Sequence, residues 1–298
     1  MSKFFKRGAL CFLLCLTFVL LAACTPNPSS FYFVYFGDAQ PNPDGPGGYN
    51  LLSDLLGTSL QTAPNSAFMI FGGDEVNDGQ SESEWQSFFD AFPQGFNKPL
   101  YLVPGNHTPS FPVENRLVRQ PDNGPKNYPG CYSFDYGPAH ILVLNSNYMY
   151  NPDINIVYEV AGWIKTDLEK SDKPWKIAVM HAPMFAAVDI DKDVERGQVM
   201  QSMYLPTLAE GGVRLILCGH QHAYSRTGAF EAYGALVQIM AVSGDKFYED
   251  TPRWYIQKYT PNTGVYITVT VTSDKLTTGA YDSSGNCIDT ITLNRGVY

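Results

Sequence analysis

Five apolar runs in the sequence each end in a short polar cluster that contains Asp, Asn or His. Four of the five histidines lie in these clusters. Solvated surface histidines would not be expected to gather at such matching positions. Carboxylate, amide and imidazole groups together suit zinc, iron or manganese better than calcium. Two such ions bridged by one carboxylate can share a hydroxide and clamp a phosphate. The clusters are Gly37-Asp38-Ala39-Gln40, Gly72-Gly73-Asp74, Pro104-Gly105-Asn106-His107, His181-Ala182-Pro183 and Gly219-His220-Gln221-His222.

The runs before these clusters predict buried strands, because continuous apolar stretches of this length are typical of strands covered on both faces. Leucines and aromatic residues recur at helical spacing between several of the runs. Alternating strands and helices favour an α/β layered fold, in which ligands collect beyond the carboxyl ends of the strands. All five polar clusters lie at such ends. The predicted strands cover residues 31–36, 67–71, 100–103, 176–180 and 214–217, and the helical patterns cover residues 51–60, 85–92 and 160–168.

Other parts of the chain predict antiparallel strands. Residues 132–136 and 141–144 are typical of a hairpin around Gly137-Pro138. Residues 265–271 alternate with a period near two, and two further strand patterns follow, at 276–281 and 288–293. This is the pattern of a C-terminal antiparallel meander with one solvated face. We expect one domain over residues 31–298, in which the meander forms a sheet that packs against the first.

Taken in order, the five clusters resemble the motifs of the calcineurin-like metallophosphoesterase superfamily. The segments 179–183 and 219–226 and the helix around Trp163 are most similar to the purple acid phosphatase branch. The likeness runs from about residue 31 to residue 293, which is nearly the whole chain after its N-terminal segment. It implies an α/β layered sandwich of two mixed β-sheets flanked by helices, with the meander at the C-terminal end.

The resemblance also implies a role for each polar side chain. It places two metal ions, divalent or of the Fe, Zn or Mn type, at the centre of the site. His107 would lie near the leaving-group oxygen as proton donor or transition-state stabiliser, or would serve as an orienting hydrogen-bond partner. Asp38 and His222 would hold the first ion, Asp74 would bridge both, and Asn106, His181 and His220 would complete the second.

Two positions differ from the family patterns. Many relatives have a His two residues after the first Asp, where this chain has Gln40. Gln40 either replaces that ligand through its amide oxygen or lies behind the ligands and orients them. Purple acid phosphatases have a Tyr three residues after the bridging Asp, where this chain has Asn77. We therefore expect no iron–tyrosinate pair, a more exchangeable first ion, and an Asn77 that hydrogen-bonds near His107.

The first 23 residues have the pattern of an export signal, with a basic head, a short apolar stretch and small residues at its end. Leu21-Ala22-Ala23-Cys24 resembles a bacterial lipobox, which implies that Cys24 receives a lipid; an ordinary cleaved signal with an accidental Cys is the alternative. Residues 24–30 then form a linker. We expect the protein in the cell envelope, on the periplasmic or cell-surface side, where a multiply acylated Cys tethers firmly.

Without that signal the chain has 17 basic and 29 acidic residues, a net charge of −12. Nothing in it predicts a nucleic-acid groove, and the membrane would be reached through the lipid anchor alone. An anionic substrate would therefore be attracted locally, for example by bound cations. Of the three remaining cysteines, Cys131 and Cys287 are the more plausible disulfide pair, because Cys218 lies in a predicted buried strand. The sequence does not determine the oligomeric state.

These features predict an exported, lipid-anchored enzyme that hydrolyses a small phosphate ester with a metal-bound hydroxide at a two-metal site. A phosphomonoesterase of the acid phosphatase kind is the first hypothesis. A phosphodiesterase or nucleotide hydrolase on the same site is an alternative, as is a lipoprotein that binds a ligand without turnover. His140 is expected to be structural, and Tyr148, Tyr150 and residues 41–48 are candidates for the cleft wall.

Overall fold

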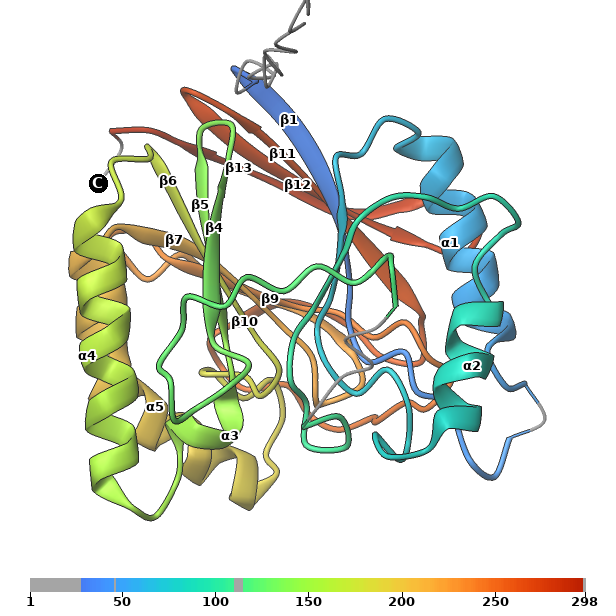
Figure 1. Cartoon of the computed structure of the whole chain (residues 1–298), viewed down its shortest axis with the longest axis horizontal. Helices are drawn as coiled ribbons and strands as arrows, with labels where there is room; N and C mark the ends of the chain where they lie inside the picture. Colours follow the sequence, from blue (N-terminus) through green and yellow to red (C-terminus); the bar gives the residue numbers. More distant parts are fainter. Residues whose placement is uncertain (1–27, 46, 110–114, 297–298) are drawn as a thin grey trace, which may run out of the picture.

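A computed structural model describes residues 28–45, 47–109 and 115–296 (Figure 1). The predicted signal and the lipidation site Cys24 lie outside the described residues, as does most of the linker. Within the described residues, no helix has the length and apolarity needed to cross a membrane. The chain forms two mixed β-sheets with helices on their outer faces, so the predicted fold class is confirmed.

The first sheet contains the N-terminal strands and the predicted meander. Its strand order is β13-β12-β11-β1-β2-β3, and β1, β2 and β3 run parallel to one another. Helices α1 and α2 pack on its outer face through leucine and aromatic side chains. The bounds are β1 Ser30–Phe36, α1 Asn50–Thr62, β2 Met69–Phe71, α2 Glu82–Asp90, β3 Leu100–Leu102, β11 Val265–Thr272, β12 Lys275–Asp282 and β13 Cys287–Asn294.

The second sheet has the strand order β10-β8-β9-β7-β6-β5-β4, with β5, β6, β7 and β9 parallel. Helices α4 and α5 cover its outer face. The predicted hairpin around Gly137 is confirmed as β4 paired with β5. The bounds are β4 Tyr132–Tyr136, β5 Ala139–Leu144, α3 Ser146–Met149, α4 Ile154–Lys170, β6 Trp175–Met180, α5 Asp191–Glu210, β7 Val213–Cys218, β8 Tyr224–Thr227, β9 Val237–Met240 and β10 Ile256–Thr260, with a 3-10 turn at Glu231–Tyr233.

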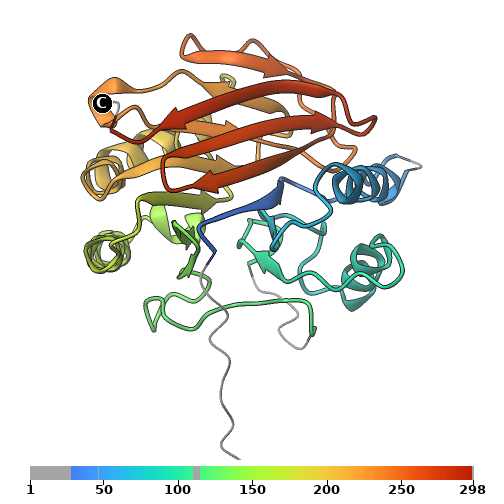
Figure 2. The same ribbon diagram turned by 90° about the horizontal axis from the view of Figure 1, so that it is seen from above.

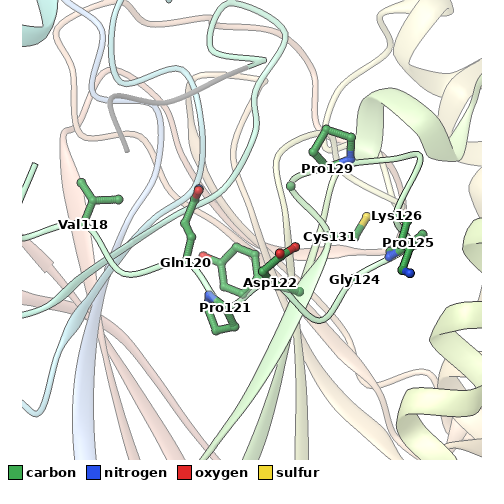
Figure 3. Close-up of a pocket in the computed structure, with 11 residues that line it drawn as sticks. Val118, Gln120, Pro121, Asp122, Gly124, Pro125, Lys126, Pro129 and Cys131 are labelled. Atoms are coloured by element: carbon green, nitrogen blue, oxygen red, sulfur yellow. The ribbon is translucent and has the colours of Figure 1, made fainter. Parts of the chain in front are cut away.

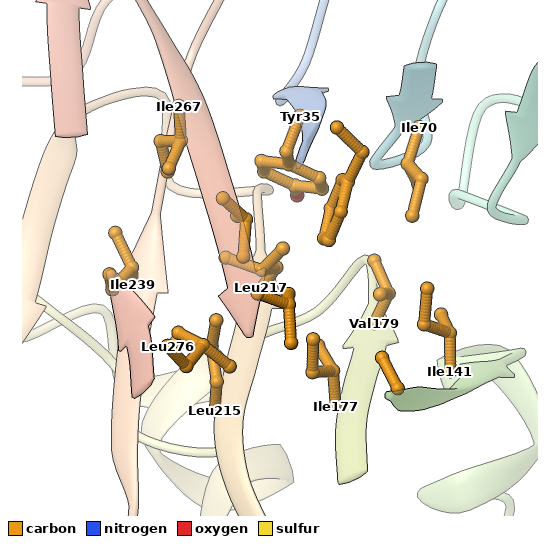
Figure 4. Close-up of a cluster of buried hydrophobic side chains, with 14 of the residues drawn as sticks. Tyr35, Ile70, Ile141, Ile177, Val179, Leu215, Leu217, Ile239, Ile267 and Leu276 are labelled. Atoms are coloured by element: carbon orange, nitrogen blue, oxygen red, sulfur yellow. The ribbon is translucent and has the colours of Figure 1, made fainter. Parts of the chain in front are cut away.

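Alternating side chains explain why the sheets need cover on both faces. Along β1, Phe33 and Tyr35 point into the core between the sheets, whereas Val34 and Phe36 point under α1 and α2. Figure 4 shows the core between the sheets, where Tyr35 and Ile267 of the first sheet approach Val179 and Leu217 of the second. Each such side chain, fully buried, contributes about 1.5–3 kcal/mol, so this shared core fixes one sheet against the other.

The prediction that the meander forms a sheet of its own is wrong. Strand β11 pairs with β1 along all seven residues of β1, so the meander extends the first sheet (Figure 2). Strand β2 covers one edge of β1 and pairs with only its last three residues. The backbone N–H and C=O groups on the opposite edge of β1 need hydrogen-bond partners, and β11 supplies them.

The predicted disulfide is also absent. Cys131, Cys218 and Cys287 are all free, the first two buried and the third exposed. Cys131 lies directly before β4 in the second sheet, where its sulfur accepts a hydrogen bond from the Asn145 backbone. Cys287 begins β13, the edge strand of the other sheet, so the two thiols belong to different layers.

Candidate metal centre

The loops at the carboxyl ends of the strands have an unusual backbone. Among the described residues only five other than glycine have positive φ, and three of them are predicted ligands: Asp74, His220 and His222, at φ 54°, 76° and 47°. Such conformations cost of order 1–3 kcal/mol each and gather at functional sites. In the loop after β7, His220 and His222 both reach the centre in this way, while Gln221 between them hydrogen-bonds to Ala187 and Asp193 instead.

The structure brings the predicted ligands together from both sheets. His181 lies at the centre: its Nε2 is 3.1 Å from Asp74 Oδ2, 3.2 Å from Asn106 Oδ1 and 3.2 Å from His220 Nδ1. On the other side, His222 Nε2 is 3.5 Å from Asp38 Oδ1. Donor atoms of Asp74, His181 and His220 all lie within 4.8 Å of one another, a spacing that one metal ion can span.

Each of the three histidines is anchored by one ring nitrogen. Nδ1 of His181 is 2.9 Å from the Gly72 carbonyl, and Nδ1 of His222 is 2.8 Å from the Lys246 carbonyl. Nε2 of His220 is 3.0 Å from Asp193 Oδ1. A carbonyl or an ionised carboxylate only accepts, so the anchored nitrogen carries the proton. When the ring is neutral, the opposite nitrogen therefore has a lone pair that faces the centre, as a metal ligand requires.

Burial and charge shape the protonation of the centre. Burial alone would lower the pKa of His181, but the carboxylates of Asp74 and Asp38 outweigh it and raise that pKa to about 10. Burial likewise opposes ionisation of Asp74, yet His181 and the His107 backbone hold its pKa well below the usual range. Burial lowers the pKa of His222. The proton on His181 thus occupies a place that a cation between the same acidic groups would take.

Buried acceptors without partners test whether this centre suits metal ions. Asp38 Oδ1 and Gln40 Oε1 are buried and have no hydrogen-bond partner. Leaving such atoms unpaired is costly, so each calls for a ligand or a water. Both side chains lie beside His222, whose Nε2 is 3.5 Å from Asp38 Oδ1 and 3.2 Å from Gln40 Nε2. Oxygen and imidazole donors of this kind fit zinc, iron or manganese.

Gln40 keeps both of its predicted roles. Rotating its amide by 180° exchanges oxygen and nitrogen at the same place, so it can present an acceptor to an ion or a donor to His222. His107 donates its backbone N–H to Asp74 Oδ1 at 2.8 Å, which fixes the predicted bridging carboxylate. Its ring nitrogen Nδ1 is 2.8 Å from the Asn77 carbonyl. The predicted contact between Asn77 and His107 is present, through the backbone of Asn77 rather than its side chain.

Two residues of this site have no counterpart among the predictions. Asp193, in the first turn of α5, bridges to His220 and to the Gln221 side chain at 3.1 Å. The hydroxyl of Thr108 accepts hydrogen bonds from the backbone N–H groups of Asp74 and Gly105, at 2.9 and 3.3 Å. Thr108 directly follows the Asn106-His107 motif, and that adjacency was the available signal. Asp193 belongs to a helix that the sequence pattern did not predict.

Other polar and hollow features lie apart from the centre. A cavity of about 370 Å³ is lined by the chain between β3 and β4 and by the first residue of β4, with residues such as Gln120, Asp122 and Lys126 (Figure 3). None of the predicted site residues lines it. His140 is structural, as expected: its two ring nitrogens contact Asp135 and Asp167 at 2.7 and 2.9 Å.

A family model described as calcineurin-like phosphoesterase matches residues 31–224, the stretch that holds every predicted ligand. The chain belongs to the calcineurin-like phosphoesterase family. Among curated members, Purple acid phosphatase 1 of Ipomoea batatas is 24% identical over 240 residues, covering 66% of this chain and 48% of that protein. Acid phosphatase type 7 of Homo sapiens is 30% identical over 149 residues, covering 45% and 34%. The homologues of this calcineurin-like phosphoesterase are thus hydrolases, specifically phosphatases.

The matches span about half or less of the length of these curated relatives. Solved structures support the same fold. Purple acid phosphatase PPD1 from yellow lupin (Lupinus luteus) superposes with a TM-score of 0.67 at 17% identity, over 91% of this chain and 55% of that one. GAP50, described as the anchor in the inner membrane complex of Plasmodium, gives a TM-score of 0.67 at 16% identity, over 90% of both chains. At these identities the likeness concerns the fold alone.

Proposed function

We propose that this calcineurin-like phosphoesterase is an exported, lipid-anchored phosphomonoesterase that hydrolyses a small phosphate ester at a centre of two metal ions. The observation that carries the proposal is the convergence of seven side chains with oxygen or nitrogen donors, in which each histidine turns its unanchored ring nitrogen inward. The family match and the acid phosphatase relatives support the reaction class.

Two cations bound here would supply Lewis-acid chemistry, neutralising phosphoryl oxygens and lowering the pKa of a water from about 15.7 to about 7. We assign Asp38, His222 and the Gln40 oxygen to the first cation. Asn106, His181 and His220 would hold the second, with Asp74 between the two. The carboxylates of Asp38 and Asp74 would supply the negative charge that holds divalent ions at this place.

His107 would assist departure of the leaving group. Its Nδ1–H is held by the Asn77 carbonyl, which leaves Nε2 as the ring atom able to give a proton to the leaving oxygen. In its protonated form His107 would donate that proton as the phosphorus–oxygen bond breaks, so that an alcohol rather than an alkoxide leaves. No side chain need attack phosphorus, so no phosphorylated residue is expected.

The test is metal analysis of the purified soluble part, followed by reloading with manganese, zinc or iron and assay of p-nitrophenyl phosphate against bis-p-nitrophenyl phosphate. We expect bound metal and faster hydrolysis of the monoester. Asp74→Asn should remove the activity, because an amide cannot bridge two cations as a carboxylate does. Asp54→Asn, at an exposed position of α1, is the matched control and should keep the activity. Faster diester hydrolysis would favour the diesterase alternative, and metal binding without turnover would favour a ligand-binding lipoprotein.

The anchor needs its own test. A multiply acylated Cys24 would hold the protein in the membrane fraction, because each buried methylene adds about 0.8 kcal/mol. Cys24→Ser should move the exported protein into the soluble fraction without changing the activity of the folded domain. Identical fractionation of the two proteins would rule out the lipid anchor and leave an ordinary cleaved signal.

A further inference from the structure

Next to the supports of the candidate centre, a cation is held over an aromatic ring. The guanidinium carbon of Arg196, on α5, lies 4.6 Å from the centre of the Tyr150 ring. Tyr150 directly follows α3, and its hydroxyl is 3.2 Å from Asn147 Oδ1. The Asn147 amide in turn donates to the Gly105 carbonyl at 2.9 Å, one residue before the predicted ligand Asn106. Arg196 and Tyr150 thus connect α5 to the loop after β3.

Arg196 is also tied to the other side of the centre. Its Nη1 is 3.5 Å from Asp193 Oδ1, the same oxygen that contacts His220 Nε2 at 3.0 Å. The guanidinium therefore lies beside the Nε2 edge of the His220 ring and is linked to it through Asp193. Arg196 makes no contact with the donors assigned to the cations, so we do not expect it to bind the phosphate that the cations hold. A group several bonds away from the phosphorus, on the leaving group, is the part of a substrate that could reach it.

The surroundings make this cation available to a ligand. The Arg196 side chain is 23% exposed, and among the described residues Asp193 is the one acidic residue with which it forms an ion pair. A guanidinium has five donors, so the single carboxylate oxygen leaves others for a planar oxyanion. Burial raises the pKa of the Tyr150 hydroxyl; Arg196 opposes that rise, and Asp193 and Asp74 add to it.

From this geometry we infer that Arg196, stacked on Tyr150, is a specificity residue that binds a second anionic group, a carboxylate or a phosphate, on the leaving group of the substrate. The inference rests on the proposed function and adds the substrate class. It also explains how an acidic chain, with net charge −9 over the full sequence, could favour a substrate more negative than a simple monoester. The attraction comes from one placed cation and not from the general field.

The experiment compares two esters that differ by one charge. The metal-loaded protein is assayed with 4-carboxyphenyl phosphate and with its neutral, similarly sized counterpart 4-carbamoylphenyl phosphate. We expect kcat/KM to favour the carboxylate by about 10-fold, the effect of one charge-assisted hydrogen bond. Arg196→Gln should abolish this preference through KM, with little change for the carbamoyl ester, and Arg196→Lys should keep part of it. Lys192→Gln, the same charge change at an exposed position of α5, should keep all of it.

The outcomes are distinguishable. If the unchanged protein hydrolyses both esters equally well, the inference is wrong while the phosphoesterase proposal stands. If Arg196→Gln slows both esters by the same factor, Arg196 only orients Asp193 and His220, and the specificity role is again excluded. If neither ester is hydrolysed after metal loading, the proposed function itself fails. Thermal melting of each variant separates any loss of folding from these results.

Discussion

At the centre of the molecule, each of three histidines is fixed by one ring nitrogen and offers the other. The anchors differ in kind: two are backbone carbonyls, for His181 and His222, and one is the carboxylate of Asp193, for His220. A charged anchor makes the opposite nitrogen more basic and therefore a stronger ligand. His220 also lies on the more open side of the site, where water competes most for the ion. Asp193 should therefore matter for metal affinity although it does not face the metals.

Replacement of Asp193 by Asn tests this role. The amide oxygen can still accept from His220, but the negative charge is gone, so we expect the affinity for the second ion to fall about 10–100-fold. Metal affinity is measured by titrating the metal-free protein in a calorimeter. Glu195→Gln, an exposed position on the same helix with the same loss of charge, is the control. Equal affinities in the Asp193 and Glu195 variants would show that the contact with His220 does not tune the site.

The sequence predicted the converging residues better than it predicted their supports. Asp38, Asp74, Asn106, His181, His220 and His222 each follow an apolar run, so their place at a strand end could be inferred from the pattern alone. Their supports obey no such rule. Two anchors are backbone carbonyls, which carry no residue identity, and the third lies on α5, far along the chain. Whether Gln40 binds an ion depends on the orientation of its side-chain amide. The spacing of residues in the sequence does not determine that orientation.

At the scale of elements, glycines let the loops at the strand ends come close enough to form the site. A Cβ atom on Gly219 would lie 2.2 Å from Asp38 Oδ2, the oxygen that accepts from the His220 backbone at 2.6 Å. A Cβ on Gly105 would lie 2.0 Å from Asp74 Oδ1. Both contacts are far shorter than atoms tolerate, so the loops after β7 and β3 depend on glycine to approach the carboxylates after β1 and β2.

Gly219→Ala should therefore separate the loop after β7 from Asp38 and displace His220 from the centre. We expect loss of metal binding and activity while far-ultraviolet circular dichroism stays native, because the strands themselves are untouched. Gly57→Ala is the matched control: a Cβ there meets nothing within 4 Å, and α1 should gain about 1 kcal/mol of helix propensity. Full metal binding by the Gly219 variant would mean that the close approach of the two loops is dispensable.

Element prediction succeeded where one physical signal dominated. Helices α1, α2 and α4 were foreseen from leucines and aromatic residues that recur on one face, and the long apolar strands from continuous burial. Helix α5 was not predicted, because Gly197 and Pro206 interrupt its pattern. Its Gly197 has a reason in tertiary structure: a Cβ there would lie 2.8 Å from the Met184 carbonyl. Strands β8 and β9 have only four residues each, too few for a period to show.

For the whole molecule, both sheets supply predicted ligands. Asp38, Gln40, Asp74 and Asn106 follow strands of the first sheet, and the three histidines follow strands of the second. Ions bound among them would therefore hold one sheet to the other, in addition to the shared apolar core. The C-terminal meander also contributes to the site, because β11 pairs with β1 and so completes the sheet that carries the N-terminal ligands.

Metal ions that bind the folded protein and not the unfolded chain should raise its stability. At a free concentration 100 times Kd the gain is about 2.7 kcal/mol for one site. For a domain of this size that corresponds to about 5–10 °C in the melting temperature. His181→Ala should lose most of this increment, because His181 contacts donors from both sheets, whereas Asp54→Asn should keep it. Calorimetric melting with and without a chelator measures the shift. If the unchanged protein melts at one temperature in both conditions while metal analysis shows the ions bound, then the ions do not join the sheets and the centre contributes nothing to the stability of the fold.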